Sequence, residues 1–437
     1  MSKQGHEVVI TGVGPVSAVG VGAEAFWDSL SAGRTQVTTR DLLFDLGRPA
    51  TVPIAAMPPH ENVPGLASHL DFLSRQESPG HRDLAYSLLA MDLALKDARL
   101  EFDRDRNSVG MVQAFEAPGV EATVTRLFQM MGMMAPPGDA SAPRPPEGAP
   151  PMSGPPGVYD MLAPSFYTMQ PFVYVHLAGK AFGLHGFCTG VHNACSSGAF
   201  AIETAAQHIR NGRAEAMIVV GGEGFDTAVR LEWFRRLELY AREPVMRPFD
   251  PTSSGFFVGE GAAAIVLESA EHAARRSAPV YARYLGGAWA HQGWKQTIPD
   301  VRSARLATVV REAMQAAAVD VENLDLVVPH GAGTSLSDGY EADCLKQAFD
   351  GRATRAVATV FKPYVGHMLA ASGIIETAAG LLSLRNQVVP ATPFGGNGAT
   401  ILPIPIASRR EDRPLRTLLK TFTGFTGHDA ALLFERA

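Results

Sequence analysis

The apolar positions of this chain follow two different periods, which predict strands and helices in turn. Short runs of consecutive apolar, largely β-branched residues are typical of buried strands, and Glu7–Thr11 is the first of them. Longer stretches such as Arg82–Leu100 keep apolar residues on one broad face and predict helices that pack against a sheet. We therefore expect an α/β architecture with buried sheets layered between helices.

The predicted elements alternate along both halves of the chain. The predicted strands are Glu7–Thr11, Val109–Val112, Ala216–Gly222, Ala262–Leu267, Leu324–Pro329, Ala356–Val360, Leu415–Phe422 and Ala430–Phe434. The predicted helices are Ala23–Leu30, Arg82–Leu100, Met169–Phe182, a run that reaches about Arg210, Val301–Ala318, Glu341–Phe349 and Gly366–Leu384. Between the first strand and the first helix, a tight turn is expected at Gly12, Gly14, Pro15 and Gly20.

The length of the chain predicts two halves, because 437 residues exceed what one ordinary core usually holds. We place the boundary after residue 255, which gives an N-terminal half of residues 1–255 and a C-terminal half of residues 256–437. Each half offers a strand followed by a reactive side chain and a helix, which hints at a duplication. Residues 33–80 are rich in turns and are expected to wrap the surface. Residues 134–157 are dense in proline, which predicts a surface insertion or a flap over a substrate channel.

The composition narrows the classes of function. Hydrophobic residues make up 46% and charged residues 19%, which is typical of a soluble protein with a large core. A net charge of -6 argues against a nucleic-acid-binding protein. No apolar run approaches the roughly 18 residues of a membrane helix. The N-terminus leads directly into a strand and does not resemble a signal peptide, so we expect a cytoplasmic protein.

Motifs for metals and dinucleotides are missing or incomplete in the sequence. The three cysteines, Cys188, Cys195 and Cys344, are too scattered for a disulfide framework, and no CxxC or HExxH motif occurs. The glycine pattern at Gly12 and Gly14 lacks the third glycine of a dinucleotide-binding loop. We expect neither a metal nor a bound cofactor.

Cys195 is the first candidate for chemistry. It lies in the motif Val191–Phe200, between a mostly apolar run and a helical run. A thiol at the beginning of a helix faces the positive end of the helix dipole, so we expect a lowered pKa and a larger thiolate fraction. A lone cysteine is more often structural than reactive. Two histidine motifs later in the chain favour the reactive interpretation.

The histidine motifs are His330–Asp338 and Lys362–His367. Each histidine follows a predicted strand, and open α/β sheets place their sites at the carboxyl ends of strands. A cysteine with a histidine supports covalent thioester chemistry. A second histidine is more than hydrolysis needs, whereas two imidazole N–H groups aimed at one carbonyl would stabilise an enolate.

With these motifs the chain resembles the β-ketoacyl synthases of the thiolase superfamily, in the elongating branch of fatty-acid and type II polyketide pathways. Five motifs carry the resemblance, and they follow one another in the family's order. They are the Cys195 turn, Arg247–Asp250 with Gly259–Gly261, His330–Thr334, Lys362–His367 and Gly424–Gly427. The resemblance implies a thiolase-like fold with two pseudo-duplicated halves. It also implies decarboxylative Claisen condensation of a Cys-bound acyl chain with a malonyl thioester.

The resemblance assigns a role to each motif. Cys195 would take the acyl chain from the phosphopantetheine of an acyl carrier protein or from coenzyme A. The backbone N–H groups of Cys195 and Phe425 would form the oxyanion hole, and the Phe425 ring would gate the acyl pocket. His330 and His367 would hold the malonyl thioester and promote loss of carbon dioxide.

Two further residues are assigned by the resemblance. Lys362 would support the His367 region, and Thr334 would contact the pantetheine arm. Asp338 and Glu341 are expected to hold the fold rather than to take part in chemistry. The family forms dimers across the sheet that precedes the nucleophile, so a homodimer or a heterodimer with a related subunit is expected.

Departures from the family pattern point to secondary metabolism. Ala332 replaces a threonine, and Thr426 and His428 alter the glycine-rich loop. One alternative is an acyltransferase that moves the acyl group from Cys195 to an oxygen or nitrogen nucleophile. Another is a non-catalytic partner subunit, against which Cys195 argues, since such subunits lack the nucleophile. The sequence leaves open the identity and length of the acyl chain, the number of elongations and the carrier.

Overall fold

The computed structural model describes residues 5–44, 48–78, 80–102, 108–130, 158–393 and 400–437. The proline-rich segment predicted at residues 134–157 lies outside the described residues. Within the described ranges, no helix is both long enough and apolar enough to cross a membrane.

Strands from both ends of the chain join in one mixed sheet of 11 strands. Its order is β12 (Val357–Ala358), β11 (Leu326–Val328), β15 (Thr417–Gly424), β16 (His428–Arg436), β10 (Ala282–His291), β1 (Val8–Ser17), β9 (Gly261–Ser269), β7 (Ala216–Glu223), β5 (Val109–Ala114) and β6 (Cys188–Val191), with β2 (Gly20–Val21) paired to β1. The central pairs, β1 with β9 and with β10, are antiparallel. Towards either end the pairs β5–β6, β5–β7, β11–β12 and β11–β15 are parallel.

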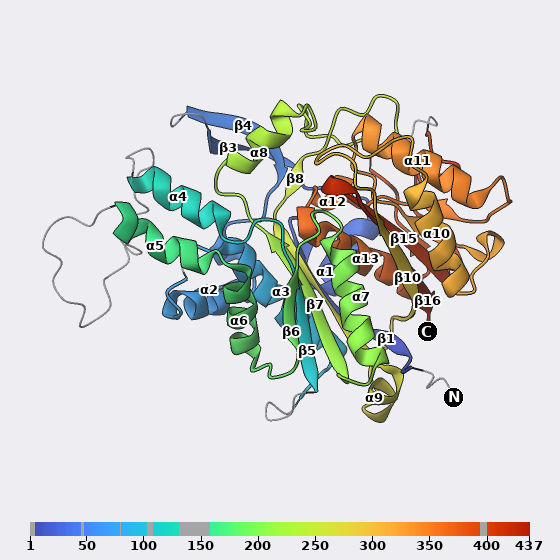
Figure 1. Cartoon of the computed structure of the whole chain (residues 1–437), viewed down its shortest axis with the longest axis horizontal. Coiled ribbons are helices and arrows are strands. Elements are labelled where there is room, and N and C mark those ends of the chain that lie inside the picture. The colour runs from blue at the N-terminus through green and yellow to red at the C-terminus, as the bar shows by residue number, and fades with distance from the viewer. Residues whose placement is uncertain (1–4, 45–47, 79, 103–107, 131–157, 394–399) are drawn as a thin grey trace, which may run out of the picture.

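Helices cover both faces of this sheet. Helix α3 (Arg82–Ala98) packs against β1, β7 and β9. Helices α7 (Ser197–Arg210) and α13 (Leu369–Asn386) pack together on the opposite face, and α13 also contacts β11 and β15 from the other arm of the sheet. Helices α10 (Arg305–Ala316) and α11 (Ser335–Phe349) lie outside that arm (Figure 1). The two arms of the sheet therefore each lie between helices, in the order helix, sheet arm, helix, sheet arm, helix. This arrangement confirms the predicted buried sheets.

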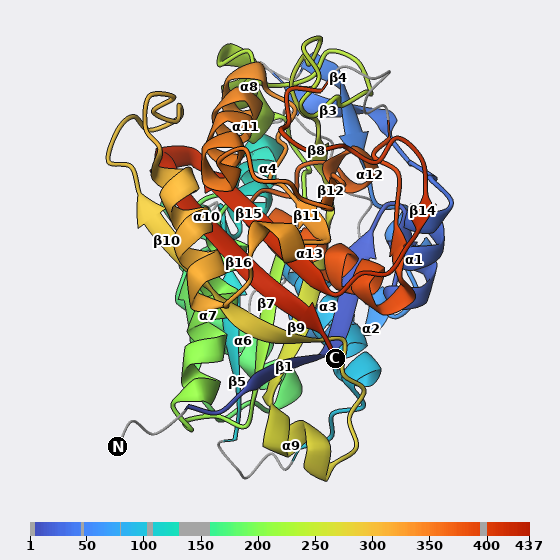
Figure 2. The ribbon, with the colours of Figure 1, turned by 90° about the vertical axis from the view of Figure 1, so that its right-hand side faces the viewer.

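Smaller elements surround this core. A three-stranded sheet is formed by β3 (Thr38–Phe44), β4 (Arg48–Ala55) and β8 (Val258–Gly259), and β13 (Val388–Val389) pairs with β14 (Glu411–Asp412). The other helices are α1 (Ala23–Ser31), α2 (Leu66–Arg75), α4 (Val120–Met130), α5 (Val158–Thr168), α6 (Pro171–Phe182), α8 (Val229–Arg236), α9 (Ala270–Arg275) and α12 (Lys362–Val365), with 3-10 turns at His60–Asn62, Val321–Asn323 and Phe425–Gly427. In Figure 2, β3, β4 and α8 lie at one end of the molecule and α9 at the other.

The predicted turn at Gly12, Gly14 and Pro15 is wrong, because β1 continues through these residues to Ser17. The glycines serve close packing instead. A Cβ atom on Gly12 would lie 2.4 Å from the carbonyl oxygen of Ala94, and one on Gly14 would lie 2.1 Å from that of Ala90. Helix α3 can therefore approach the strand only because these side chains are absent.

Other differences lie at element ends and in amphipathic strands. The sequence pattern missed β10, the strands β3 and β4, and α2 within residues 33–80. Helix α13 begins at Leu369 rather than at Gly366, because Gly366 has a φ of 73° and lies in a turn. The division of the chain after residue 255 stays a prediction.

Candidate active site

Cys195 lies on a sharp turn between β6 and α7. The turn passes through Ala194, whose φ of 49° is unusual for a residue with a side chain. The Ser197 hydroxyl accepts a hydrogen bond from the backbone N–H of Asn193 at 2.8 Å. The Ser196 hydroxyl donates to the carbonyl oxygen of His428 at 2.7 Å. The turn is therefore fastened both to its own helix and to the loop at residues 424–428.

The expected lowering of the Cys195 pKa is wrong. The side chain is only 6% exposed, and burial raises the pKa of the thiol far above its ordinary value. Nearby Glu116 raises it further, whereas the Lys362 ammonium and a hydrogen bond from the Phe425 backbone N–H lower it. Burial is the largest of these effects, so the resting thiol is protonated at neutral pH.

His330 follows β11 and lies in a loop held by α11. The backbone N–H groups of His330 and Gly331 donate to the two carboxylate oxygens of Glu341 at 2.8 and 2.9 Å. Asp338, from the first turn of the same helix, accepts from the backbone N–H groups of Gly333 and Phe249 at 3.1 and 2.8 Å. Two buried carboxylates thus fix the path of the loop around the imidazole.

His367 is positioned by the glycine motif at residues 259–261. Its backbone N–H donates to the carbonyl oxygen of Phe257 at 2.8 Å, and its carbonyl oxygen accepts from the N–H of Gly259 at 3.2 Å. A Cβ atom on Gly259 would lie only 1.7 Å from the carbonyl oxygen of Val365. The absence of a side chain at this position lets the His367 turn lie against β8.

The structure brings the two histidines together. Their ring centroids are 5.6 Å apart, with an interplanar angle of 77°. His367 Nδ1 accepts hydrogen bonds from the Leu369 backbone N–H at 3.2 Å and from the Ser372 hydroxyl at 2.8 Å. The hydroxyl is free to donate because its oxygen already accepts from the Met368 N–H. The proton of the neutral His367 ring is therefore on Nε2.

His330 is held in the same tautomer by Lys362. The Lys362 ammonium lies 3.5 Å from His330 Nδ1 and donates to the His330 carbonyl oxygen at 2.5 Å. An ammonium has no acceptor, so Nδ1 must accept and Nε2 carries the proton. Burial, reinforced by the Lys362 charge, holds the pKa of both imidazoles well below its usual value. Both rings are therefore neutral N–H donors at physiological pH.

A buried ion cluster that sequence analysis missed lies beneath these rings. Lys362 and Lys420 share Glu376, with N–O distances of 2.6 and 2.8 Å, and all three side chains are almost completely buried. Glu376 lies on the apolar helix α13, and Lys420 lies on the apolar strand β15. Charged residues in such surroundings require partners, and that signal was available in the sequence.

The structure also describes the other two predicted residues, Thr334 and Phe425. Thr334 is buried and directly precedes α11. Phe425 is half-buried and packs against Phe234, with ring centroids 6.1 Å apart, while its backbone N–H faces the Cys195 thiol. The aromatic ring of Phe256 packs edge-on against His367 at 4.9 Å. Cys195 thus comes before residue 255 in the chain, whereas the histidines, Lys362 and the Phe425 loop come after it.

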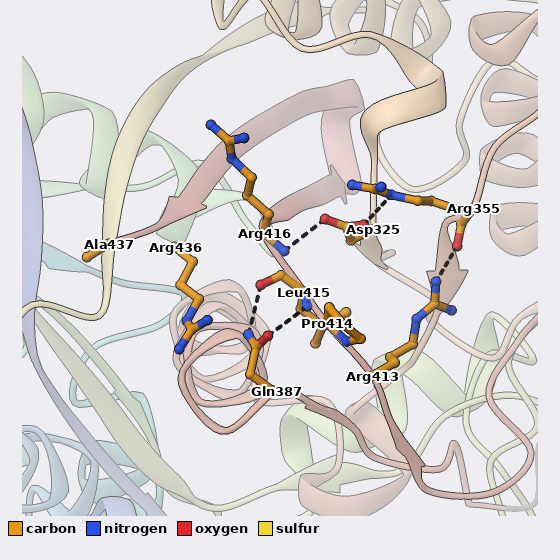
Figure 3. Close-up of a pocket in the computed structure, with 9 residues that line it drawn as sticks. All are labelled: Asp325, Arg355, Gln387, Arg413, Pro414, Leu415, Arg416, Arg436 and Ala437. Atoms are coloured by element: carbon orange, nitrogen blue, oxygen red, sulfur yellow. Dashed lines mark hydrogen bonds and ion pairs between the residues drawn. The ribbon is translucent and has the colours of Figure 1, made fainter.

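A cavity of about 510 Å³ lies elsewhere in the molecule, and none of these residues lines it. It lies at the opposite end of β11, where Asp325 precedes the strand while His330 follows it at the site end. Figure 3 shows that two of its arginines are engaged locally: Arg355 pairs with Asp325 at 2.5 Å, and Arg413 donates to the Arg355 carbonyl oxygen. This cavity is separate from the candidate active site.

Comparison with known proteins supports the resemblance to β-ketoacyl synthases. Family models for the N-terminal and C-terminal domains of β-ketoacyl synthases match residues 164–273 and 281–394. The chain is 30% identical to polyketide β-ketoacyl synthase 1 of Streptomyces halstedii, over 98% of this chain and 97% of the relative.

Solved structures share the fold over nearly the whole chain. A β-ketoacyl synthase from Burkholderia phymatum covers 99% of this chain, and this chain covers all of that structure, with a TM-score of 0.80 and 24% identity. A second match is a chain from the solved complex of a type II polyketide acyl-carrier protein with its ketosynthase. It has a TM-score of 0.78 and 22% identity, and it covers 99% of this chain, while this chain covers 100% of it. From its sequence, its fold and the matched domains, this chain belongs to the β-ketoacyl synthase family, the condensing acyltransferases of polyketide and fatty-acid biosynthesis.

Proposed function

We propose that the chain performs decarboxylative condensation of an acyl group on Cys195 with a malonyl thioester, in secondary metabolism. The observation that carries this proposal is the pair of neutral imidazoles, each with its proton on Nε2, in the site that also holds Cys195. Simple transfer of an acyl group from a cysteine needs no second imidazole donor. An enolate, by contrast, is stabilised by two N–H donors that carry no charge to begin with.

In the first step, the Cys195 sulfur attacks the carbonyl carbon of the incoming thioester. The sulfur–carbon bond to the carrier breaks, and the carrier thiol leaves with the proton that Cys195 gives up. The backbone N–H of Phe425, which faces the sulfur, is placed to stabilise the oxyanion together with the Cys195 N–H. Because the resting thiol is protonated, its proton must leave as the new bond forms.

In the second step, the malonyl carbon–carbon bond breaks and carbon dioxide leaves. The electron pair of that bond moves into an enolate whose oxygen accepts from Nε2 of His330 and His367. The enolate carbon attacks the acyl carbonyl, and the Cys195 sulfur leaves and regains a proton. Lys362 acts through His330, by fixing its tautomer, and we assign contact with the pantetheine arm to Thr334, which directly precedes α11.

We further propose that the chain acts in the cytoplasm on chains carried by an acyl carrier protein, and that it pairs through the edge strand β6. This strand ends the 11-stranded sheet and directly precedes the nucleophile turn. Phe187, one residue before the strand, is 42% exposed. An open edge beside an exposed aromatic ring favours pairing with a second copy or with a related subunit.

Intact-mass measurement tests the proposed reaction. Wild type and Cys195→Ala are incubated with an acyl thioester and then with malonyl carrier protein. We expect an acyl adduct on wild type alone, discharged by malonate with release of a β-keto product. An adduct that only oxygen or nitrogen nucleophiles discharge would instead establish acyl transfer. An unacylated wild type that co-purifies with an active ketosynthase would establish the partner-subunit alternative.

A further inference from the structure

A small cavity whose lining includes neither histidine lies at the end of β5, the strand that pairs with β6 before the nucleophile turn. It lies at the carboxyl ends of β5 and β7, and its lining includes Asp83, Gln113, Glu116, Tyr174 and Glu223. Its volume of about 10 Å³ accepts a single group the size of a water molecule. The lining is unusually rich in carboxylates for a space next to an acylated cysteine.

Two hydrogen-bond acceptors in this lining are buried without a partner among the described residues. They are Oε2 of Glu116 and Oε1 of Gln113. The neighbouring acids differ, since Asp83 accepts from the Tyr174 hydroxyl at 3.0 Å and Glu223 pairs with Arg230 at 2.8 Å. Buried acceptors are normally satisfied, so these two indicate a donor that the chain itself does not provide.

The segment that carries Glu116 is fastened to the nucleophile turn. The Glu116 carbonyl oxygen is bonded to the ring of His192. The backbone N–H of Phe115 donates to the Val191 carbonyl oxygen at 3.1 Å, and its carbonyl oxygen accepts from the Ser197 hydroxyl at 3.3 Å. The Glu116 carboxylate is also near enough to the thiol to raise its pKa. The cavity that both acceptors line is therefore connected to the nucleophile turn through the segment of Phe115 and Glu116.

The site has two sides, and the reaction assigns one to each substrate. The histidines reach the sulfur from the C-terminal half and take the malonyl unit. The carboxyl ends of β5, β6 and β7 reach it from the N-terminal half and remain for the acyl chain. An apolar chain carries no hydrogen-bond donor, so if it filled this space it would exclude water and leave Glu116 and Gln113 without a partner.

We propose that Glu116 and Gln113 receive a hydrogen-bond donor carried by the acyl chain, so that the preferred substrate is a short acyl thioester bearing a hydroxyl or an ammonium group. This inference rests on the proposed acylation of Cys195 and adds the substrate class. A site built to bond a polar group rejects the analogue that lacks it much more strongly than an apolar pocket rejects an added hydroxyl.

The test measures loading of Cys195 with matched acyl thioesters by intact mass. Each set has three members that differ only at the chain end, which is a methyl, a hydroxyl or an ammonium group, on backbones of three to five carbons. For at least one length, we expect wild type to load a donor-bearing chain at least about tenfold faster than its methyl analogue. Loading of all chains at equal rates would overturn the proposal and would identify the cavity as a water site.

Three variants identify the group that recognises the donor. Glu116→Leu is expected to remove the preference and to load the methyl analogue faster than wild type does. Glu116→Gln retains an acceptor without a charge, so it should keep a hydroxyl preference and lose an ammonium preference. Gln113→Leu should weaken the preference without removing it. If circular dichroism shows Glu116→Leu to be unfolded, Glu116→Gln and Gln113→Leu decide, and an unchanged preference in both refutes the proposal.

The same samples separate this inference from the proposed function. Addition of malonyl carrier protein to loaded wild type reports condensation whatever chain was preferred. Unselective loading followed by a β-keto product would refute the substrate class and leave the condensing function intact. Selective loading that malonate cannot discharge would support the substrate class and refute the condensing function.

Discussion

At the scale of single residues, the chemistry depends on groups that burial keeps uncharged. Burial lowers the pKa of His330 and His367 and raises that of Cys195, so each is in its neutral form at physiological pH. Neutral imidazoles donate without presenting a positive charge to the substrate. The positive charge of the site is instead carried by Lys362 and Lys420, which Glu376 balances in part.

Replacing each histidine separately should affect decarboxylation of the malonyl unit but not acyl loading of Cys195. We expect His330→Asn and His367→Asn to retain acyl loading of Cys195 but to slow decarboxylation of malonyl carrier protein about a hundredfold or more, because each removes an oriented donor. Release of carbon dioxide and intact mass measure the two steps. His60→Asn is the matched control, because burial also lowers the pKa of His60 but its ring lies against Tyr86. Equal loss of loading and decarboxylation would contradict the assigned roles.

At the scale of elements, α12, α13 and β15 meet at one buried ion cluster. Lys362 begins α12, Glu376 lies within α13 and Lys420 lies within β15. One carboxylate serves two ammonium groups, so the three positions are not equivalent. Removing an ion whose partner stays buried is costly, whereas removing a surplus ion is less so.

This asymmetry predicts an order of stabilities. Glu376→Gln removes the ion-pair partner of two buried ammonium groups and should lower the free energy of unfolding by about 3–5 kcal/mol. Lys362→Met leaves a balanced pair of Glu376 and Lys420 and should cost less than Glu376→Gln. Urea unfolding followed by circular dichroism measures both. If Lys362→Met were the more destabilising change, the proposed sharing of Glu376 would be wrong.

The elements also show what the sequence could predict. Continuous apolar runs such as Ala216–Gly222 and one-sided helices such as Arg82–Leu100 were placed correctly, because burial on both faces or on one face leaves a direct periodic signal. Strand β10 was missed because apolar residues such as Leu285 and Trp289 occupy its more exposed positions, so its sequence lacks an apolar–polar alternation, and because it includes Gly286 and Gly287. The glycines of β1 were misread as a turn because the approaching helix α3 is not visible in the local pattern.

The residues of the candidate site could be predicted from sequence motifs, but the shifts of their pKa values could not. Cys195, His330, His367 and Lys362 stand in recognisable motifs, and the structure places them around one centre. The direction of the Cys195 pKa shift was wrong, since desolvation depends on every chain segment that covers the thiol. Glu116 was also not singled out, because the cavity that it lines is formed by β5, β7, α3 and α6, which lie far apart in the sequence.

At the scale of the whole molecule, buried acids make stability depend on pH. Burial raises the pKa of Glu223 to about 8 and that of Asp338 to about 7, and the pairing of Glu223 with Arg230 only partly opposes the shift. Because Glu223 binds its proton more tightly in the folded state, its contribution to stability is complete below pH 4.5. It is lost as the pH rises towards 8.

We therefore expect Glu223→Gln to flatten the decline in stability between pH 5 and pH 8, by about 1–3 kcal/mol. Urea unfolding at the two pH values measures the change, with Glu24→Gln on the exposed face of α1 as the control. A decline identical to that of wild type would show that Glu223 keeps the same protonation state on folding.

The strand order described above has a consequence for synthesis of the protein on the ribosome. Strand β1 is made first, but its neighbours β9 and β10 emerge only after residue 261. Among the strands of this sheet β16 comes latest in the sequence, yet it lies between β10 and β15 in the strand order. In the nascent chain one edge of β10 must therefore stay unpaired until β16 has been made. Chaperone supply and translation speed, more than local folding, should set the yield of active protein.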